Sequence, residues 1–157
     1  PDFVFKIPGY SCLREDRADG YGGVCLLIRN SSTFSSFPLP SHSNCFSVIA
    51  AIVDGICFVS IYVPHPSLQI FNEIKNFISV LPRPFMILGD FNSHHTSWGS
   101  SVSNSYGYEL LDILDMYSLC ILNSGSPTRL TKPGEVISAI DLSICTPQLA
   151  SSLSWST

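Results

Sequence analysis

Residues 85–92 read Phe-Met-Ile-Leu-Gly-Asp-Phe-Asn, and this octet decides both the fold class and the place of the functional site. Its apolar run ends at a glycine and is typical of a strand buried on both faces. Asp90 and Asn92 follow at the carboxyl end of this strand. Since ligand sites in open α/β sheets gather at that end, the octet predicts an α/β fold with a polar site at the rim of its sheet.

Asp90 and Asn92 are two positions apart, so in an extended chain their side chains point to the same side. Phe91, between them, then points back into the core. A carboxylate beside an amide suits a hard cation, a water nucleophile or a phosphate. The alternative is an ordinary Asx turn, in which Asp90 and Asn92 only end the strand.

Composition predicts one globular domain over residues 1–157, a length that buries a sizeable core. Hydrophobic residues make up 45% and charged residues 13%, which excludes a disordered chain. The net charge is −4 and the sequence lacks a run of Lys or Arg, so charge alone does not indicate nucleic-acid binding. The longest apolar tract, residues 48–63, is interrupted by Asp54-Gly55, and no membrane span is predicted.

The six cysteines are scattered without a Cys-x-x-Cys pair. Most lie in apolar runs, where a thiol behaves as a small hydrophobic group. We therefore predict reduced thiols and an intracellular protein. The sequence begins at Pro1 without an initiator methionine or a signal-type segment, and we expect a piece of a longer protein.

Hydrophobic periodicity predicts the remaining elements. Asp54-Gly55 between two apolar runs is the strongest short signal of a β-hairpin. Ser67 is placed to cap a helix that Pro82 ends, whereas residues 30–44, rich in Ser and Pro, predict a surface loop. Beside the octet, strands are predicted at 22–29, 45–53, 56–63, 119–122 and 136–145, and helices at 68–81, at 106–117 and, a short one, after Thr146-Pro147. Together they predict a mixed α/β sheet flanked by helices.

Several short motifs in order along the chain resemble one known family. They are Ile7-Pro8-Gly9-Tyr10 with Arg14, Asp16 and Arg17; Gly22-Gly23-Val24; Ile61-Tyr62-Val63-Pro64; Gly89-Asp90-Phe91-Asn92 with His94, His95, Trp98 and Gly99; Leu122-Asn123 through Pro127-Thr128-Arg129; Ser138 to Ser143; and Trp155. The chain resembles the endonuclease/exonuclease/phosphatase superfamily, and within it the apurinic-type endonuclease domain of non-LTR retrotransposons of the jockey kind. The resemblance implies a four-layer α/β sandwich.

The family hydrolyses phosphodiester bonds with the help of Mg²⁺, with Mn²⁺ as a substitute, and here the resemblance implies a DNA-nicking endonuclease. It implies that Asp90 orients or deprotonates the attacking water and that Asn92 holds this water or a phosphate oxygen. The same two residues are implied as weak metal ligands. The resemblance matches Tyr62 to a tyrosine whose hydroxyl reaches the scissile phosphate, and the alternative is an aromatic side chain packed in the sheet.

Asp141 places a carboxylate inside the predicted strand 136–145, where an unpaired charge is costly to bury. It is therefore expected to have a partner or a function. The resemblance implies that Asp141 grips the imidazole of a catalytic histidine and fixes its tautomer. The alternative is an acid at a strand end that faces solvent.

His94, His95, Thr128 and Arg129 are predicted to contact nucleic acid. Adjacent histidines in an extended segment point opposite ways, and neither has a third ligand at the spacing of a zinc site. We expect one of them to line the substrate groove and the other to pack near Trp98.

The family's first metal-holding glutamate and its catalytic histidine are expected to lie outside these 157 residues, together with the first strands and the last strand. The fragment is then expected to be impaired as a nuclease. The alternatives are a non-catalytic, degenerate remnant of such a domain, or a phosphomonoesterase of the same fold. Inositol-phosphate relatives carry Cys-Asp-Arg where this chain has Ile140-Asp141-Leu142, which argues against the phosphomonoesterase. The expected partners are DNA and a reverse transcriptase domain of the same polyprotein, not a membrane, and the expected place of action is the nucleus.

Overall fold

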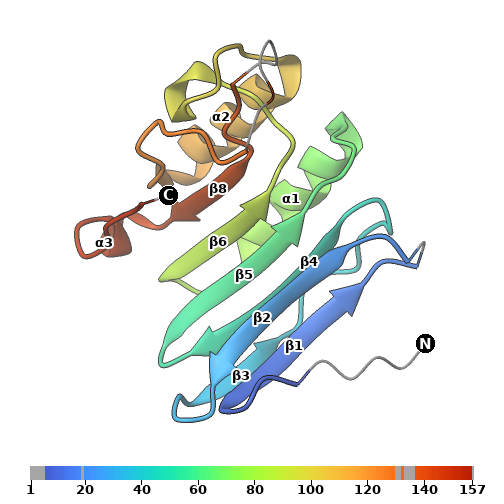
Figure 1. The fold of residues 1–157 in the computed structure, drawn as a ribbon, viewed down its shortest axis with the longest axis vertical. Coiled ribbons are helices and arrows are strands. Elements are labelled where there is room, and N and C mark those ends of the chain that lie inside the picture. Colours follow the sequence, from blue (N-terminus) through green and yellow to red (C-terminus); the bar gives the residue numbers. More distant parts are fainter. Residues whose placement is uncertain (1–5, 19, 130–131, 133–136, 157) are drawn as a thin grey trace.

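Two β-sheets and flanking helices form the fold (Figure 1). The computed structural model describes residues 6–18, 20–129, 132 and 137–156. The elements are β1 (Tyr10–Asp16), β2 (Gly23–Arg29), β3 (Phe34–Phe37), β4 (Ser47–Val53), β5 (Ile56–Tyr62), α1 (Leu68–Val80), β6 (Phe85–Asp90), a 3₁₀ turn (Thr96–Trp98), α2 (Ser105–Tyr117), β7 (Cys120–Ile121), β8 (Asp141–Cys145) and α3 (Pro147–Ala150).

The larger sheet has six strands in the order β3-β4-β5-β6-β8-β7. Strands β4 and β5 form the predicted hairpin, whose turn residues Asp54 and Gly55 have φ angles of 48° and 86°. Strands β5 and β6 are parallel and are connected by α1, whereas the other neighbours are antiparallel. The Ser67 side chain caps α1 by accepting a hydrogen bond from the Ile70 N–H, as predicted. The sheet is therefore mixed, as the sequence indicated.

Helices α1 and α2 lie side by side behind the six-stranded sheet and cover one of its faces (Figure 1). The main core lies between these two helices and the six-stranded sheet. It includes Val59, Ile61 and Ile87 from the strands, with Phe71 and Ile113 from the helices. The small sheet of β1 and β2 packs in front of β4 and β5 (Figure 1). Two sheets with flanking helices confirm the predicted α/β sandwich.

Three sequence predictions differ from the structure. The segment 30–44 contains strand β3, which pairs with β4, because Phe34 and Phe37 bury part of their rings there. Strand β1 was not predicted, since its alternation ends in the charged run Arg14 to Asp16. The predicted strand 136–145 begins only at Asp141, and residue 136 lies outside the described part of the chain. Within the described residues, no helix has the length and apolarity needed to cross a membrane.

Candidate functional site

Tyr62, Asp90 and Asp141 occupy one row across three neighbouring strands. Tyr62 ends β5 opposite Asp90, which ends β6, and Asp90 lies opposite Asp141, which begins β8. Directly opposed residues in a sheet point to the same face, so the three side chains project together from one end of the sheet. The structure thus brings together residues that are far apart in sequence, while their catalytic roles stay predictions.

Gly89 allows β5 and β6 to approach closely beside this row. A Cβ atom at Gly89 would lie 1.8 Å from the carbonyl oxygen of Ile61, so only glycine fits. The backbone ladder then continues past the ends of the strands. The Val63 N–H donates to the Asp90 carbonyl at 2.8 Å, and the Phe91 N–H donates to the Ile140 carbonyl at 3.0 Å. The backbone of Asp90 is therefore fixed from both sides.

Asn92 reaches the site through an Asx turn and not through the extended geometry that the sequence suggested. Its φ angle is 47°, in the left-handed region, and its N–H donates to Asp90 Oδ1 at 2.8 Å. Its side-chain Nδ2 donates to the Val63 carbonyl at 3.0 Å, directly after Tyr62. Phe91 is buried, as predicted. The Asx turn and the polar site are thus the same structure, not alternatives.

The Asp90 carboxyl group carries an electrostatic penalty. Burial raises its pKa above the ordinary value, the Asn92 N–H opposes this shift, and the negative charge of Asp141 adds to it. A carboxylate that is half-buried next to a second carboxylate is stabilised by a nearby cation. The arrangement therefore favours positive charge at this end of the sheet.

Asp141 is exposed, contrary to the expectation of a buried strand carboxylate. The reason is that β8 begins at this residue, so its side chain lies at the rim of the sheet. Its backbone, by contrast, is held firmly. The Thr128 Oγ1 atom accepts hydrogen bonds from the Ile140 and Asp141 N–H groups, both at 3.1 Å.

Asn123 also holds the backbone at Asp141, although the sequence placed it only within a family motif and indicated no role for it. Its Nδ2 donates to the Asp141 carbonyl at 2.9 Å, and its Oδ1 accepts the Ser143 N–H at 2.9 Å. The Asn123 side chain is nearly buried and thus continues the β7–β8 ladder with an amide group in place of backbone. The motif Leu122-Asn123 after the predicted strand 119–122 was the sequence signal that could have pointed to this residue.

Tyr62 contacts the small sheet through the turn between β1 and β2. A Cβ atom at Gly22 would lie 3.2 Å from Tyr62 Cε1 and 3.8 Å from the Arg17 Cδ atom. The ring of Tyr62 therefore packs against the Gly22 backbone, and Arg17 lies beside it. Packing of the ring in the sheet and a place in the site are compatible for Tyr62, because this side chain is only half-buried.

The two histidines differ, as expected for adjacent residues. His95 is 7% exposed, its Nδ1 accepts the Ser97 N–H at 3.1 Å, and its ring lies 5.0 Å from that of Trp98. This confirms that one histidine packs near Trp98, and the burial of His95 argues against a direct contact with nucleic acid. His94 is half-buried and is the one left to line a groove.

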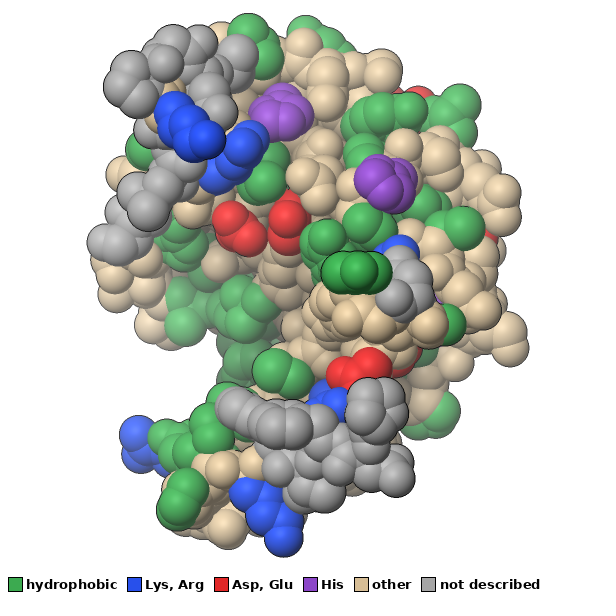
Figure 2. Space-filling view, turned by 45° about the vertical axis from the view of Figure 1, so that its right-hand side comes forward, with side chains coloured by type: hydrophobic (Ala, Val, Ile, Leu, Met, Phe, Trp, Pro, Cys, Tyr) green, Lys and Arg blue, Asp and Glu red, His purple; other side chains and the backbone are tan. Residues whose placement is uncertain are grey.

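Thr128 and Arg129, the other predicted nucleic-acid contacts, lie next to the acidic pair, which consists of Asp90 and Asp141. Thr128 is half-buried and its oxygen serves β8, as described above, while Arg129 is exposed. Figure 2 shows acidic side chains close together on one face of the molecule, with basic and histidine side chains near them. The exposed Arg129 follows Thr128 directly, so a positive charge also lies near the carboxylate of Asp141.

The donors at this site fit a small hard cation. Asp90 and Asn92 offer a carboxylate and an amide, which are oxygen ligands, and Asp141 adds a second carboxylate nearby. Mg²⁺ is commonly held by one or two carboxylates and keeps several waters. Among the described residues, no group of three or more His, Cys, Asp or Glu side chains is arranged to hold a metal. The carboxylate and amide oxygens of the site are thus compatible with a divalent metal ion.

The fold is shared with known nucleases. The endonuclease domain of TRAS1, a telomere-specific non-LTR retrotransposon, matches with a TM-score of 0.73 and 23% identity over 91% of this chain and 68% of that one. An AP endonuclease from Archaeoglobus fulgidus matches with a TM-score of 0.68 and 16% identity over 91% of this chain and 69% of that one. The architecture is that of the endonuclease/exonuclease/phosphatase class of hydrolases.

Sequence comparison narrows this class. The X-element polymerase of Drosophila melanogaster is 27% identical over 131 residues, 80% of this chain and 14% of that protein. The jockey polymerase of Drosophila funebris is 30% identical over 129 residues, 78% of this chain and 14% of that protein. Residues 56–157 match the family model described as endonuclease-reverse transcriptase, and the chain belongs to this family. It is an endonuclease-type domain of non-LTR retrotransposons and spans about one seventh of the length of these curated relatives.

Proposed function

We propose that this chain supplies the centre of a Mg²⁺-dependent DNA endonuclease that nicks target DNA for retrotransposon insertion. The observation that carries the proposal is the row of Tyr62, Asp90 and Asp141 across three neighbouring strands. Hydrolysis of a phosphodiester bond needs a base for the attacking water and donors for the phosphate oxygens. The row and the adjoining Asn92 offer these groups at one end of a rigid sheet.

Each residue has a distinct role in this proposal. Asp90 orients or deprotonates the water, and the amide of Asn92 holds this water or a phosphate oxygen. The Tyr62 hydroxyl donates to the scissile phosphate from the neighbouring strand. The exposed carboxylate of Asp141 orients the imidazole of a histidine, which fixes its tautomer. His94, Thr128 and Arg129 contact the DNA backbone around the acidic pair.

Asp90 and Asn92 would hold Mg²⁺, or Mn²⁺ in its place, which supplies positive charge to the phosphate and lowers the pKa of a bound water. The partners are target DNA and the reverse transcriptase domain of the same polyprotein, in keeping with relatives named RNA-directed DNA polymerases. The domain then acts in the nucleus when its substrate is genomic DNA.

The test uses the chain extended at both ends with the flanking segments of the Drosophila funebris jockey protein. This protein should nick supercoiled plasmid in the presence of Mg²⁺. Asp90→Asn keeps the size of the side chain but removes the base, so the nicking rate should fall by a factor on the order of 10² to 10⁴ while DNA binding is retained. Asp141→Asn should lower the rate less, because it misorients a catalytic group without deleting it.

Asp112→Asn, which changes an exposed acid on α2, is the matched control and should leave nicking unchanged. Equal nicking by the extended protein and its Asp90→Asn variant would remove Asp90 from the proposed role. Cleavage of a phosphomonoester but not of plasmid DNA would assign the site to the phosphatase branch of the fold instead.

A further inference from the structure

Cys120 and Cys145 lie directly opposite each other on the antiparallel strands β7 and β8. Both are free thiols. Both cysteines lie at the other end of β8 from the proposed site, because Cys145 ends this strand and Asp141 begins it. None of the roles proposed above uses either cysteine.

The register of this pair suits a disulfide. Opposed residues in antiparallel strands have Cα atoms about 4.5 to 5.5 Å apart, and their side chains point to the same face. A disulfide requires Cα atoms roughly 4.4 to 6.8 Å apart. The backbone is therefore already in place for a bond between the two sulfur atoms.

The two thiols differ in access to solvent. Cys145 is 0% exposed, whereas Cys120 is half-buried on the edge strand. Burial raises the pKa of the Cys145 thiol above its ordinary value, and the neighbouring Cys120 raises it further. Reagents dissolved in water thus reach Cys120 first, with Cys145 buried behind it.

We propose that Cys120 and Cys145 form an oxidation-sensitive dithiol, which a hydroperoxide converts to an intrachain disulfide between β7 and β8. The Cys120 thiolate attacks the peroxide oxygen and breaks the O–O bond, which gives a sulfenic acid, and the departing hydroxide is protonated to water. The Cys145 sulfur then attacks the sulfenic sulfur, loses its proton and displaces a second water. Two thiols lose two electrons, and one molecule of hydrogen peroxide becomes two of water.

The disulfide would be a covalent cross-link at the edge of the six-stranded sheet. Strand β7 contains only two residues, so few backbone hydrogen bonds hold it to β8. The disulfide would join β7 to the strand that carries Asp141 at its other end. Oxidation should therefore raise the midpoint of thermal unfolding, because the closed loop restricts the unfolded chain.

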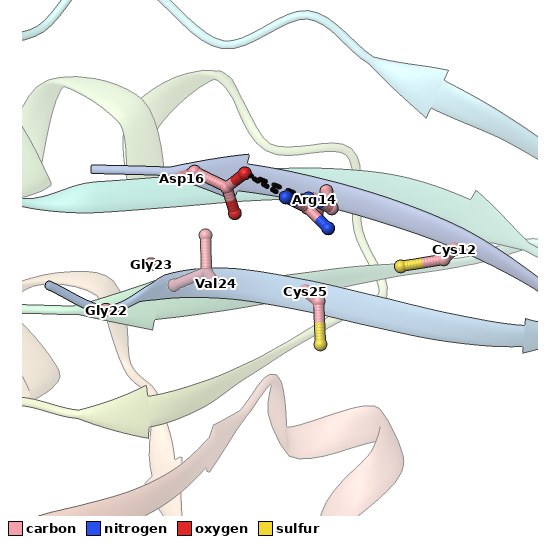
Figure 3. A pocket seen from close by; sticks show the side chains of 7 residues that line it. All are labelled: Cys12, Arg14, Asp16, Gly22, Gly23, Val24 and Cys25. Atoms are coloured by element: carbon pink, nitrogen blue, oxygen red, sulfur yellow. Dashed lines mark hydrogen bonds and ion pairs between the residues drawn. The ribbon is translucent and has the colours of Figure 1, made fainter. Parts of the chain in front are cut away.

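The chain contains a matched control pair in the small sheet. Cys12 lies opposite Leu27, and Cys25 lies opposite Arg14, so the two cysteines are diagonal neighbours. Diagonal residues are about 7 to 8 Å apart, beyond the usual range for a disulfide. Figure 3 shows that Cys12 on β1 and Cys25 on β2 both line the hollow over the small sheet, and that their side chains do not point toward each other. Cys25 is exposed, so this pair is more accessible than the opposed pair but has the wrong register.

The experiment treats the fully reduced chain with one equivalent of hydrogen peroxide, blocks the remaining thiols and digests the protein with trypsin. Arg129 lies between the two cysteines in sequence, so cleavage places them in different peptides. We expect a linked peptide pair that contains Cys120 and Cys145, the loss of two thiols per molecule, and reversal by dithiothreitol. Cys57, whose pKa is raised to about 11 by burial, should stay reduced.

Cys120→Ser should abolish the linked pair, whereas Cys12→Ser should leave it unchanged. Because a change at the buried Cys145 could affect folding, a second measurement uses a monosubstituted trivalent arsenical, which bridges two neighbouring thiols without oxidising them. It should bind the native chain and Cys12→Ser, but not Cys120→Ser. Oxidation that links Cys12 to Cys25 or joins separate molecules while Cys120 and Cys145 stay reduced would overturn the proposal. So would arsenical binding that survives Cys120→Ser.

Discussion

The two sheets of this domain differ in how fully they are covered by neighbouring elements. In the six-stranded sheet, β5, β6 and β8 are covered by α1 and α2 on one face, and their backbone ladder continues past the acidic row. The sheet of β1 and β2 has an outer face of exposed groups, among them Arg14, Asp16 and Cys25. The turn between β1 and β2 meets the site where the Gly22 backbone lies against the Tyr62 ring.

This difference shows how the domain divides its tasks. Asp90 and Asp141, which belong to the proposed site, stand on the well-packed sheet, where neighbouring strands set their separation. The small sheet contributes the turn between β1 and β2, which packs on the ring of Tyr62. Its outer face is exposed to solvent. We therefore expect the site to be sensitive to changes in the six-stranded sheet and tolerant of changes in the small one.

Gly89→Ala should have the largest effect on folding. The added Cβ would lie 1.8 Å from the Ile61 carbonyl oxygen, so β5 and β6 must separate next to the row. Overpacking against backbone should lower the free energy of unfolding by about 3 kcal/mol or more. Urea denaturation followed by circular dichroism measures it.

Gly22→Ala is the matched change in the small sheet. Its φ angle is 87°, and the new Cβ would lie 3.2 Å from a ring atom of Tyr62 that can shift. The cost should be about 1–2 kcal/mol, from the positive φ alone. If Gly22→Ala destabilises the protein as much as Gly89→Ala does, the two sheets are not as unequal as described.

Asn123→Ala should have an intermediate effect. It leaves the Asp141 carbonyl and the Ser143 N–H without their side-chain partner, at a cost of about 1–3 kcal/mol in the free energy of unfolding. Thr128→Val should act in the same direction, and Thr128→Ser should restore stability because it keeps the accepting oxygen. Ser124→Ala, an exposed neighbour, is the control, and Asn123→Ala with the stability of this control would contradict the role of Asn123.

Glu73→Gln should have the smallest effect, and one that depends on pH. Burial acts to raise the pKa of Glu73, but hydrogen bonds from Ser43 and Gln69 and the charge of His42 outweigh it, so the pKa is lowered. Its stabilising contribution is therefore present above the ordinary glutamate pKa and lost as the pH falls through the lowered value. At neutral pH the substitution should cost about 0.5 kcal/mol or less, since the group is largely solvated.

Unfolding curves of the native chain and Glu73→Gln, measured from neutral to acidic pH, test this directly. The difference in stability between them should shrink as the pH falls. A difference that grows toward acid would mean that the Glu73 pKa is shifted in the other direction.

Local signals in the sequence were sufficient for much of the fold. The Asp54-Gly55 turn, the Ser67 cap and the octet each combine a backbone preference with an apolar pattern, and each lies where predicted. Strand β1 was missed because its alternation ends in the charged run Arg14 to Asp16, and β3 because it is only four residues long and lies in a segment rich in Ser and Pro.

The site was predictable in membership but not in detail. The family resemblance gave Tyr62, Asp90 and Asp141 roles in one site, and the pairing of β5, β6 and β8 places the three residues side by side. The exposure of Asp141 could not be read from its apolar neighbours, because at the start of β8 the backbone N–H groups donate to the side chain of Thr128, thirteen residues before Asp141. The supporting amide of Asn123 likewise acts through tertiary contacts, whereas the left-handed Asn92 belongs to the Asx turn that the sequence offered as the alternative.

The central claim is that Asp90, Asn92, Asp141 and Tyr62 form one site that attracts a divalent cation. Mn²⁺ titrated into the isotopically labelled chain broadens the NMR signals of amides near the bound ion. The account predicts broadening at the ends of β5 and β6 and the start of β8, lost in Asp90→Asn and retained in Asp112→Asn. Broadening centred elsewhere, or unchanged by Asp90→Asn, would contradict it.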